Sequence, residues 1–118
     1  MRKTSPPKTD SFKDLVLYQM CELVGLSCRA MFGGYGLYCG GTFFGIIFKG
    51  RLYFKTDAAT SKDYIQRGMK PFRPRATQAL TNYYEVPVEI IEEADRLVQW
   101  ARTALDVQSN RKTSRPGK

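Results

Sequence analysis

Few residues in this chain could do chemistry, because the sequence contains no histidine. Histidine is the commonest general base and the usual partner of a serine or cysteine nucleophile. Asp57 and Asp63 could form a carboxylate pair, but both lie at the expected start of a helix, where acidic residues are favoured anyway. Cys28 precedes Arg29, yet neighbouring strand residues face opposite ways, so the arginine is a poor activator of that thiol. We therefore expect no catalytic residues and interpret the protein as not an enzyme.

Ligands for a metal or a cofactor are also missing from the sequence. The three cysteines, Cys21, Cys28 and Cys39, include no pair separated by two residues, so they do not form the usual zinc pattern. The glycines of residues 31–41 precede a strand rather than a helix, so they do not form a dinucleotide fingerprint. We expect neither a metal nor a cofactor, and we interpret the cysteines as small apolar side chains in a reducing compartment.

Basic side chains suggest a binding surface instead. The segment 67–75 holds four cations and one phenylalanine, which could grip phosphates while the ring stacks on a base. The alternative is a solvated loop whose phenylalanine enters the core. A second basic set is predicted on the open face of a sheet. The candidate contacts are Arg67, Lys70, Phe72, Arg73, Arg75, Arg29, Arg51, Tyr53 and Lys55.

Most of the net charge of +8 lies at the two ends of the chain, which are rich in Pro, Ser, Thr and Gly. We expect residues 1–10 and 109–118 to be disordered basic tails around one folded domain, residues 11–108. Basic tails strengthen binding to any polyanion without selecting one. The chain has no apolar run long enough for a membrane span and no secretion signal, so we expect a cytoplasmic protein that binds no membrane.

The apolar spacing predicts the elements that position these residues. Steps of three and four predict helices over 11–24, 57–67 and 87–106. A period of two predicts strands, with the first four joined by tight turns into an antiparallel meander. Pro71 and Pro74 predict that residues 69–80 are irregular. In the fourth strand, Leu52 and Phe54 should be buried, while Arg51, Tyr53 and Lys55 should face water. The five predicted strands are 27–32, 35–39, 42–48, 51–56 and 81–86.

Five motifs in order resemble the N-terminal domain of the TfoX (Sxy) family, over residues 12–106. They are Arg29-Ala30-Met31-Phe32-Gly33-Gly34-Tyr35-Gly36-Leu37-Tyr38, Gly50-Arg51-Leu52-Tyr53-Phe54-Lys55-Thr56-Asp57, Arg67-Gly68-Met69-Lys70-Pro71-Phe72, Tyr83-Tyr84-Glu85-Val86-Pro87 and Trp100-Ala101-Arg102. The resemblance implies an α+β domain with an N-terminal helix, a curved antiparallel sheet of about five strands, a short helix after the meander and a C-terminal helix.

The resemblance also implies a regulatory role. The family's best-known members are regulators of natural competence that act with the cyclic-AMP receptor protein, and they carry a second, helical domain. We expect this chain to be a stand-alone N-terminal domain that binds a protein partner, for example a transcription factor. The alternative is direct nucleic-acid binding through the basic loop, the sheet face and the tails. Both a monomer and a weak homodimer stay open. We expect structural roles for the motif residues Gly33, Gly34, Tyr35, Gly36, Tyr38, Tyr83, Tyr84 and Pro87.

Overall fold

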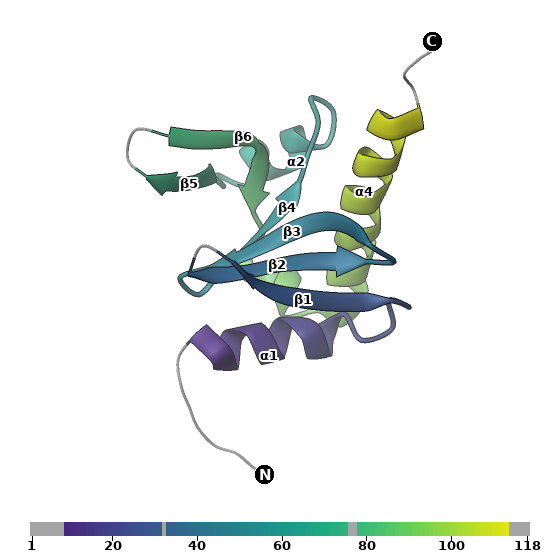
Figure 1. Ribbon diagram of the computed structural model, residues 1–118. Helices are drawn as coiled ribbons and strands as arrows, with labels where there is room; N and C mark the ends of the chain where they lie inside the picture. The colour runs from purple at the N-terminus through teal and green to yellow at the C-terminus, as the bar shows by residue number, and fades with distance from the viewer. Residues whose placement is uncertain (1–8, 32, 76–77, 114–118) are drawn as a thin grey trace.

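The computed structural model describes residues 9–31, 33–75 and 78–113. They form an α+β domain in which helices pack against one antiparallel sheet (Figure 1). The elements in chain order are α1 (Thr9–Gln19), β1 (Leu26–Met31), β2 (Gly34–Cys39), β3 (Thr42–Phe48), β4 (Arg51–Lys55), α2 (Ser61–Gln66), β5 (Pro71–Arg75), β6 (Gln78–Glu85), α3 (Val88–Ile91) and α4 (Ala94–Thr113).

The sheet has six strands in the order β1-β2-β3-β4-β6-β5, and every neighbouring pair is antiparallel. The predicted meander of β1 to β4 is confirmed, with boundaries within two residues of those predicted. Its turns use glycines in the left-handed region, including Gly40 at φ 59° and Gly41 at φ 85° in the β2–β3 turn. Beyond β4 the sheet bends within β6, and the β5–β6 hairpin extends away from the meander (Figure 1).

The prediction of an irregular segment over residues 69–80 was wrong. Pro71 and Pro74 lie in β5, and the following strand begins at Gln78 rather than at 81. The prolines exclude a central strand, but β5 is the outer strand of the sheet, where a missing N–H can face away from the ladder. The register between β5 and β6 shifts on both sides of Phe72, which relieves the ladder next to the prolines.

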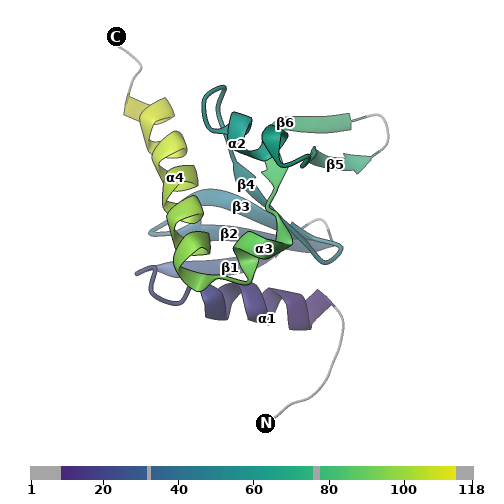
Figure 2. The same ribbon diagram turned by 180° about the vertical axis from the view of Figure 1, so that it is seen from behind.

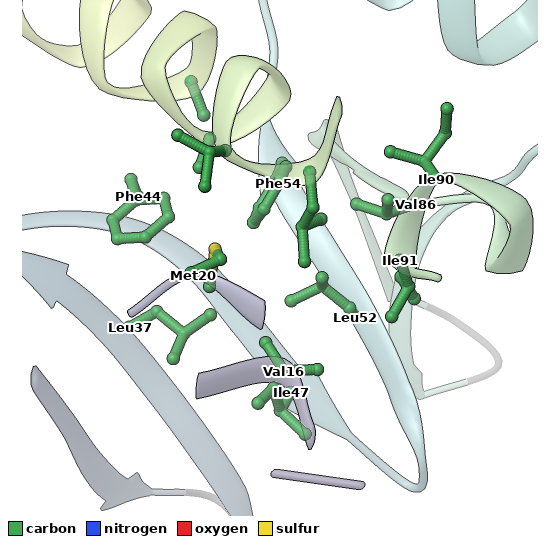
Figure 3. Packing of buried hydrophobic residues seen from close by; sticks show 14 of the residues in the cluster. Val16, Met20, Leu37, Phe44, Ile47, Leu52, Phe54, Val86, Ile90 and Ile91 are labelled. Carbon is green, nitrogen blue, oxygen red and sulfur yellow. The ribbon is translucent and has the colours of Figure 1, made fainter. Parts of the chain in front are cut away.

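One face of the sheet carries the main core. Figure 2 shows α3 and α4 standing in front of the meander strands, and in Figure 1 the same strands lie in front of α4. Figure 3 shows how side chains from this face meet α1 and α3. The most deeply buried include Val16, Met20, Leu37, Phe44, Ile47, Leu52, Phe54, Ile90 and Leu97.

The opposite face was predicted to be wet at Arg51, Tyr53 and Lys55, and this prediction was correct for Arg51 but wrong for the other two. Tyr53 is 8% exposed and Lys55 is 6% exposed. The strand β5 brings Phe72 to within 4.7 Å of the Tyr53 ring, measured between centroids, and a second small core forms there. The side chains of β4 do alternate between the two faces as predicted. The face that alternation alone assigns to water is partly covered by β5, which the sequence did not predict.

The helices differ from their predicted bounds at the ends. The first helix stops at Gln19, and tight turns then carry Met20 and Leu23 into the core, so helical spacing persists after the helix ends. The predicted helix 87–106 is two helices, because the helical conformation is interrupted at residues 92–93 before α4 begins. This break lets the isoleucines of α3 and the apolar side of α4 enter one core.

The last helix is longer than predicted, since α4 continues to Thr113. Residues 9–10 and 109–113, which we predicted to be disordered, are therefore helical, and residues 1–8 and 114–118 lie outside the described part. Extending an existing helix by a residue costs little free energy, because the unfavourable nucleation step has already been made. Basic residues near the C-terminal end also interact favourably with the helix dipole. Within the described residues, no helix combines the length and apolar character that crossing a membrane requires.

Candidate binding face and basic pocket

Strand register places four of the candidate contacts on one surface. Arg29 pairs with Gly36, Gly36 with Ile46, and Ile46 with Tyr53, so these residues face the same side, away from α3 and α4. Residues two apart in a strand share a face, which adds most of the remaining members, and a bulge between β2 and β3 places Phe43, the partner of Tyr38, on the same side. We call this surface the helix-free face, and it comprises Arg29, Met31, Gly36, Tyr38, Phe43, Ile46, Phe48, Arg51, Tyr53 and Lys55.

Aromatic rings occupy much of the helix-free face. The rings of Tyr38 and Phe43 have centroids 5.2 Å apart, and Phe43 lies 5.8 Å from Tyr83. Tyr38, Phe43 and Phe48 are only partly buried. The guanidinium of Arg29 sits 5.5 Å from the centre of the Tyr38 ring, which is within cation–π range. The β1–β3 end of this face therefore presents half-exposed rings beside a cation.

The other end of the helix-free face holds a basic pocket of about 420 Å³. Strand β4 supplies two of its walls, β6 supplies a third, and the segment around the start of β5 supplies the rest. The backbone N–H of Glu85 donates to the carbonyl oxygen of Lys70 at 3.0 Å, which ties these walls together. The lining residues are Arg51, Tyr53, Gly68, Lys70, Pro71, Arg73 and Glu85.

One ion pair crosses the pocket. The Arg51 Nη1 atom lies 3.1 Å from each carboxylate oxygen of Glu85. Tyr53 pairs with Glu85 in the ladder and lines the pocket. Burial raises the pKa of the Tyr53 phenol, and the nearby Glu85 carboxylate raises it further against the opposing effect of Arg51. The hydroxyl therefore stays protonated at neutral pH and can donate a hydrogen bond.

The structure brings four of the nine candidate contacts into this pocket, namely Arg51, Tyr53, Lys70 and Arg73. Two others are buried. Phe72 is 2% exposed and lies in the second core. Of the two alternatives for this ring, the structure therefore shows burial in a core rather than exposure for stacking on a base. Lys55 lies with its ammonium 5.2 Å from the centre of the Tyr83 ring.

The remaining candidates lie elsewhere. Arg67 turns toward the helical side, where its guanidinium is 3.0 Å from the Glu89 carboxylate and 5.4 Å from the centre of the Trp100 ring. Arg29 lies on the helix-free face but in the outer strand β1, outside the pocket lining. The side chain of Arg75 lies outside the described part of the chain.

Sequence reasoning missed three pocket residues, Gly68, Pro71 and Glu85. All three lie in the motifs quoted above, but Glu85 meets Tyr53 only through the pairing of β4 with β6, which the sequence does not show. The alternation in β6 offered one clue, since Glu85 falls two residues after Tyr83, on the same face of the strand.

The motif residues occupy positions in turns and packing. A Cβ atom on Gly34 would lie 2.2 Å from the Ile47 carbonyl oxygen, and Gly33 has φ 78°. Pro87 caps α3, where its missing N–H costs nothing. The four tyrosines of the set lie in ring and cation contacts: Tyr35 with Lys13, Tyr38 with Phe43, Tyr83 with Phe43, and Tyr84 with Tyr64. A Cβ atom on Gly36 would clash with the Met31 side chain.

The groups first considered for chemistry have structural surroundings. The Asp57 carboxylate accepts hydrogen bonds from the backbone N–H groups of Ala59 and Thr60, and the latter bond is the main cause of its lowered pKa. Cys28 pairs with the core residue Leu37, so it faces away from Arg29. Within the described residues, no group of three or more Cys, Asp or Glu side chains could hold a metal ion.

Comparison with known proteins adds the family. A search of curated proteins gives no match to this sequence. The profile of the family described as TfoX N-terminal domain matches residues 19–108, which span every strand, α2, α3 and most of α4. Because this match covers most of the chain, the protein belongs to the TfoX N-terminal domain family.

Proposed function

We propose that this protein is a non-catalytic regulatory module that binds a protein partner through its helix-free face, in transcription regulation. Family membership supports a regulatory or partner-binding role at a general level. The non-catalytic part of the proposal rests on the absence of histidine from the sequence.

The observation that carries this proposal is the set of half-exposed rings at the β1–β3 end. Tyr38 and Phe43 lie on the helix-free face, with Arg29 over the Tyr38 ring, whereas Phe48 on the same face packs against Phe72 of β5. Tyrosine, phenylalanine and arginine are enriched in protein–protein interfaces, because they combine a large contact area with a polar end. Such side chains on an uncovered sheet surface favour a partner that packs across the strands.

Quantitative affinity capture tests this proposal. The wild-type chain, a variant with Arg29→Glu and Tyr38→Ala, and a control with Lys62→Glu would be used as baits in lysate of the producing cell. Lys62 is an exposed cation on α2, outside the helix-free face. We expect one or more proteins to be retained by the wild type and the control and lost from the double variant. Equal retention by all three baits would contradict the proposed face.

A second function, direct nucleic-acid binding, is favoured by the convergence of Arg51, Lys70 and Arg73 in one pocket. Cations that contact phosphates give binding a steep dependence on salt. Fluorescence anisotropy of labelled duplex DNA would test this function with residues 11–108 and with the variant Arg73→Ala, Arg75→Ala. Strong binding by the trimmed chain that falls in the variant would support it. If the full chain binds DNA and residues 11–108 do not, the binding comes from the charge of the two chain ends alone.

A further inference from the structure

The two outer strands of the sheet are protected to different degrees. Strand β5 carries Pro71 and Pro74, which lack the N–H that a further strand would need, and its register shifts on both sides of Phe72. Strand β1, at the other end of the strand order, contains no proline and pairs with β2 over all six of its residues without a shift. In the described part of the chain, no strand pairs with the outer side of β1. Its regular edge is therefore a template for one more strand.

The backbone groups that point away from β2 can be assigned from the register. The N–H of Gly40 donates to the carbonyl oxygen of Gly25 at 3.1 Å, and these two residues extend the β1–β2 register by one pair. Hydrogen-bonded pairs alternate along an antiparallel ladder, so residues 27, 29 and 31 of β1 bond to β2. The N–H and C=O groups of Cys28 and Ala30 therefore point to the outer side, where the described chain supplies no ladder partner for them.

The middle of β1 is accessible to another chain. The Cys28 side chain packs against the main core, and the Ala30 side chain lies on the same side of the strand. Ala30 is nevertheless exposed, as are Ser27 and Arg29 on the opposite side. The helices that cover the meander therefore leave this stretch of the edge open.

Arg29 gives the open edge a preference for acidic residues. It is exposed on the helix-free face, with its guanidinium 5.5 Å from the centre of the Tyr38 ring, and no described carboxylate forms an ion pair with it. A residue facing Arg29 across an added ladder belongs to a non-hydrogen-bonded pair, in which the side chains are closest. An opposite charge at that position stabilises the pair, whereas a second copy of this chain centred on the same residue would place arginine against arginine. Two copies also repel through their net charges of +8.

We propose that an extended segment of the partner adds to β1 as a further strand of the sheet, with an acidic residue opposite Arg29. Main-chain hydrogen bonds to Cys28 and Ala30 hold such a segment, and the side chains select it, as in other cases of strand addition to a sheet edge. The inference rests on the proposed function, because β1 borders the face on which the partner is proposed to dock. It adds the conformation and the charge of the bound segment.

Displayed peptides provide a probe that does not require the partner to be known. Random short peptides would be selected on the wild-type chain, and a synthetic copy of the most enriched sequence would be added to isotope-labelled protein. We expect the enriched peptides to carry Asp or Glu. We also expect the bound peptide to slow amide hydrogen exchange at Cys28 and Ala30 at least about tenfold, because these amides gain hydrogen-bond acceptors. The amide of Arg29, which already bonds to β2, should change less.

Two variants at one position isolate the main-chain contact. Ala30→Pro removes the outward N–H and should weaken peptide binding about tenfold, as the loss of one hydrogen bond does. Ala30→Val keeps that N–H and should bind the peptide as the wild type does. Proline is tolerated in an edge strand where its nitrogen faces away from the ladder, and circular dichroism checks the fold. If Ala30→Pro does not fold, the exchange measurement on the wild type decides.

Several results would overturn the added strand. They are the enrichment of no peptide or only of peptides without an acid, binding that leaves Cys28 and Ala30 unprotected, and equal affinity of the two Ala30 variants. A concentration-dependent dimer that Ala30→Pro abolishes would assign the edge to a second copy instead. In the affinity capture, a partner lost from the bait with Arg29→Glu and Tyr38→Ala but kept by Ala30→Pro would overturn the added strand and leave the docking face intact. A partner kept by both baits would contradict both proposals.

Discussion

At the scale of single residues, the basic side chains have three different environments. Lys55 is buried against Tyr83, Arg67 spans Glu89 and Trp100, and Lys70 faces the pocket. All three belong to the basic set that the sequence nominates for binding. Charge in the sequence therefore identifies candidates, and tertiary packing decides which of them can meet a ligand.

Asp57 is expected to stabilise the start of α2 in a pH-dependent way. Replacing it with Ala removes the acceptor of two backbone N–H groups and should lower the free energy of unfolding by about 1 kcal/mol at pH 7. The folded-state pKa lies below the ordinary value of 3.8, so this stabilisation is present above that value and is lost as the pH falls further. Urea unfolding of the wild type and of Asp57→Ala at neutral and acidic pH measures this difference in the free energy of unfolding. A cost independent of pH would contradict the role of the charged carboxylate.

Arg67 is expected to fasten α2 to the helical side of the domain. The variant Arg67→Ala loses one exposed ion pair and a contact with the Trp100 ring, so we expect a cost of about 0.5–1.5 kcal/mol. Thermal unfolding of Arg67→Ala and Arg67→Lys would separate the ring contact from the charge. A variant as stable as the wild type would show that neither contact stabilises the fold.

At the scale of elements, β5 changes the character of the whole helix-free face. It is an edge strand with two prolines, and its phenylalanine covers Tyr53 while the residues on either side line the pocket. A strand that would look irregular in isolation thus builds both the second core and the basic pocket.

Phe72 should therefore be the residue through which β5 is held in place. Phe72→Ala is expected to cost about 3–5 kcal/mol, because the ring is almost fully buried and contacts Tyr53 and Phe48. Phe72→Leu should cost clearly less. Chemical denaturation gives the energies, and amide hydrogen exchange should show faster opening of β5 and β6. Unchanged exchange in those strands would contradict this role.

The meander could be predicted from the sequence because its causes are local. Alternation, tight turns and glycine pairs fix β1 to β4, and their boundaries were close to those observed. The strand β5 could not be predicted in the same way, because its prolines exclude an inner strand and are tolerated only at the edge of the sheet, a position that the local sequence does not reveal. The same limit explains why only four of the nine proposed contacts line the pocket. The alternation within a strand shows which side chains share a face, but the whole sheet decides whether that face is covered.

Gly34 tests how tightly the meander is packed. In Gly34→Ala the new Cβ atom would meet the backbone oxygen of Ile47, so β2 and β3 must separate. We expect a loss of about 1–3 kcal/mol, since a backbone atom cannot move aside as a side chain can. Ser27→Ala on the exposed side of β1 provides a control with little expected change. Equal stability of both variants would show that the strands have room at this position.

At the scale of the whole molecule, the domain has two unlike faces. One face is covered by helices and contains the main core (Figure 2). In the described part of the chain, β5 covers one end of the other face, which presents rings at the β1–β3 end and cations at the β4–β6 end. An apolar patch also lies on the outer side of α1, where Leu15 is 43% exposed and Tyr18 is 73% exposed. We propose that the partner docks on the helix-free face, so an experiment must distinguish that face from the apolar patch on α1.

Site-specific photo-crosslinking in the producing cell makes that distinction. A photoreactive residue would replace Arg29 on the helix-free face, Tyr18 on α1 or Gln99 on the exposed side of α4. We expect a discrete crosslinked protein from position 29 and none from positions 18 and 99. A crosslink from position 18 alone would place the partner on α1 and contradict the proposed docking face.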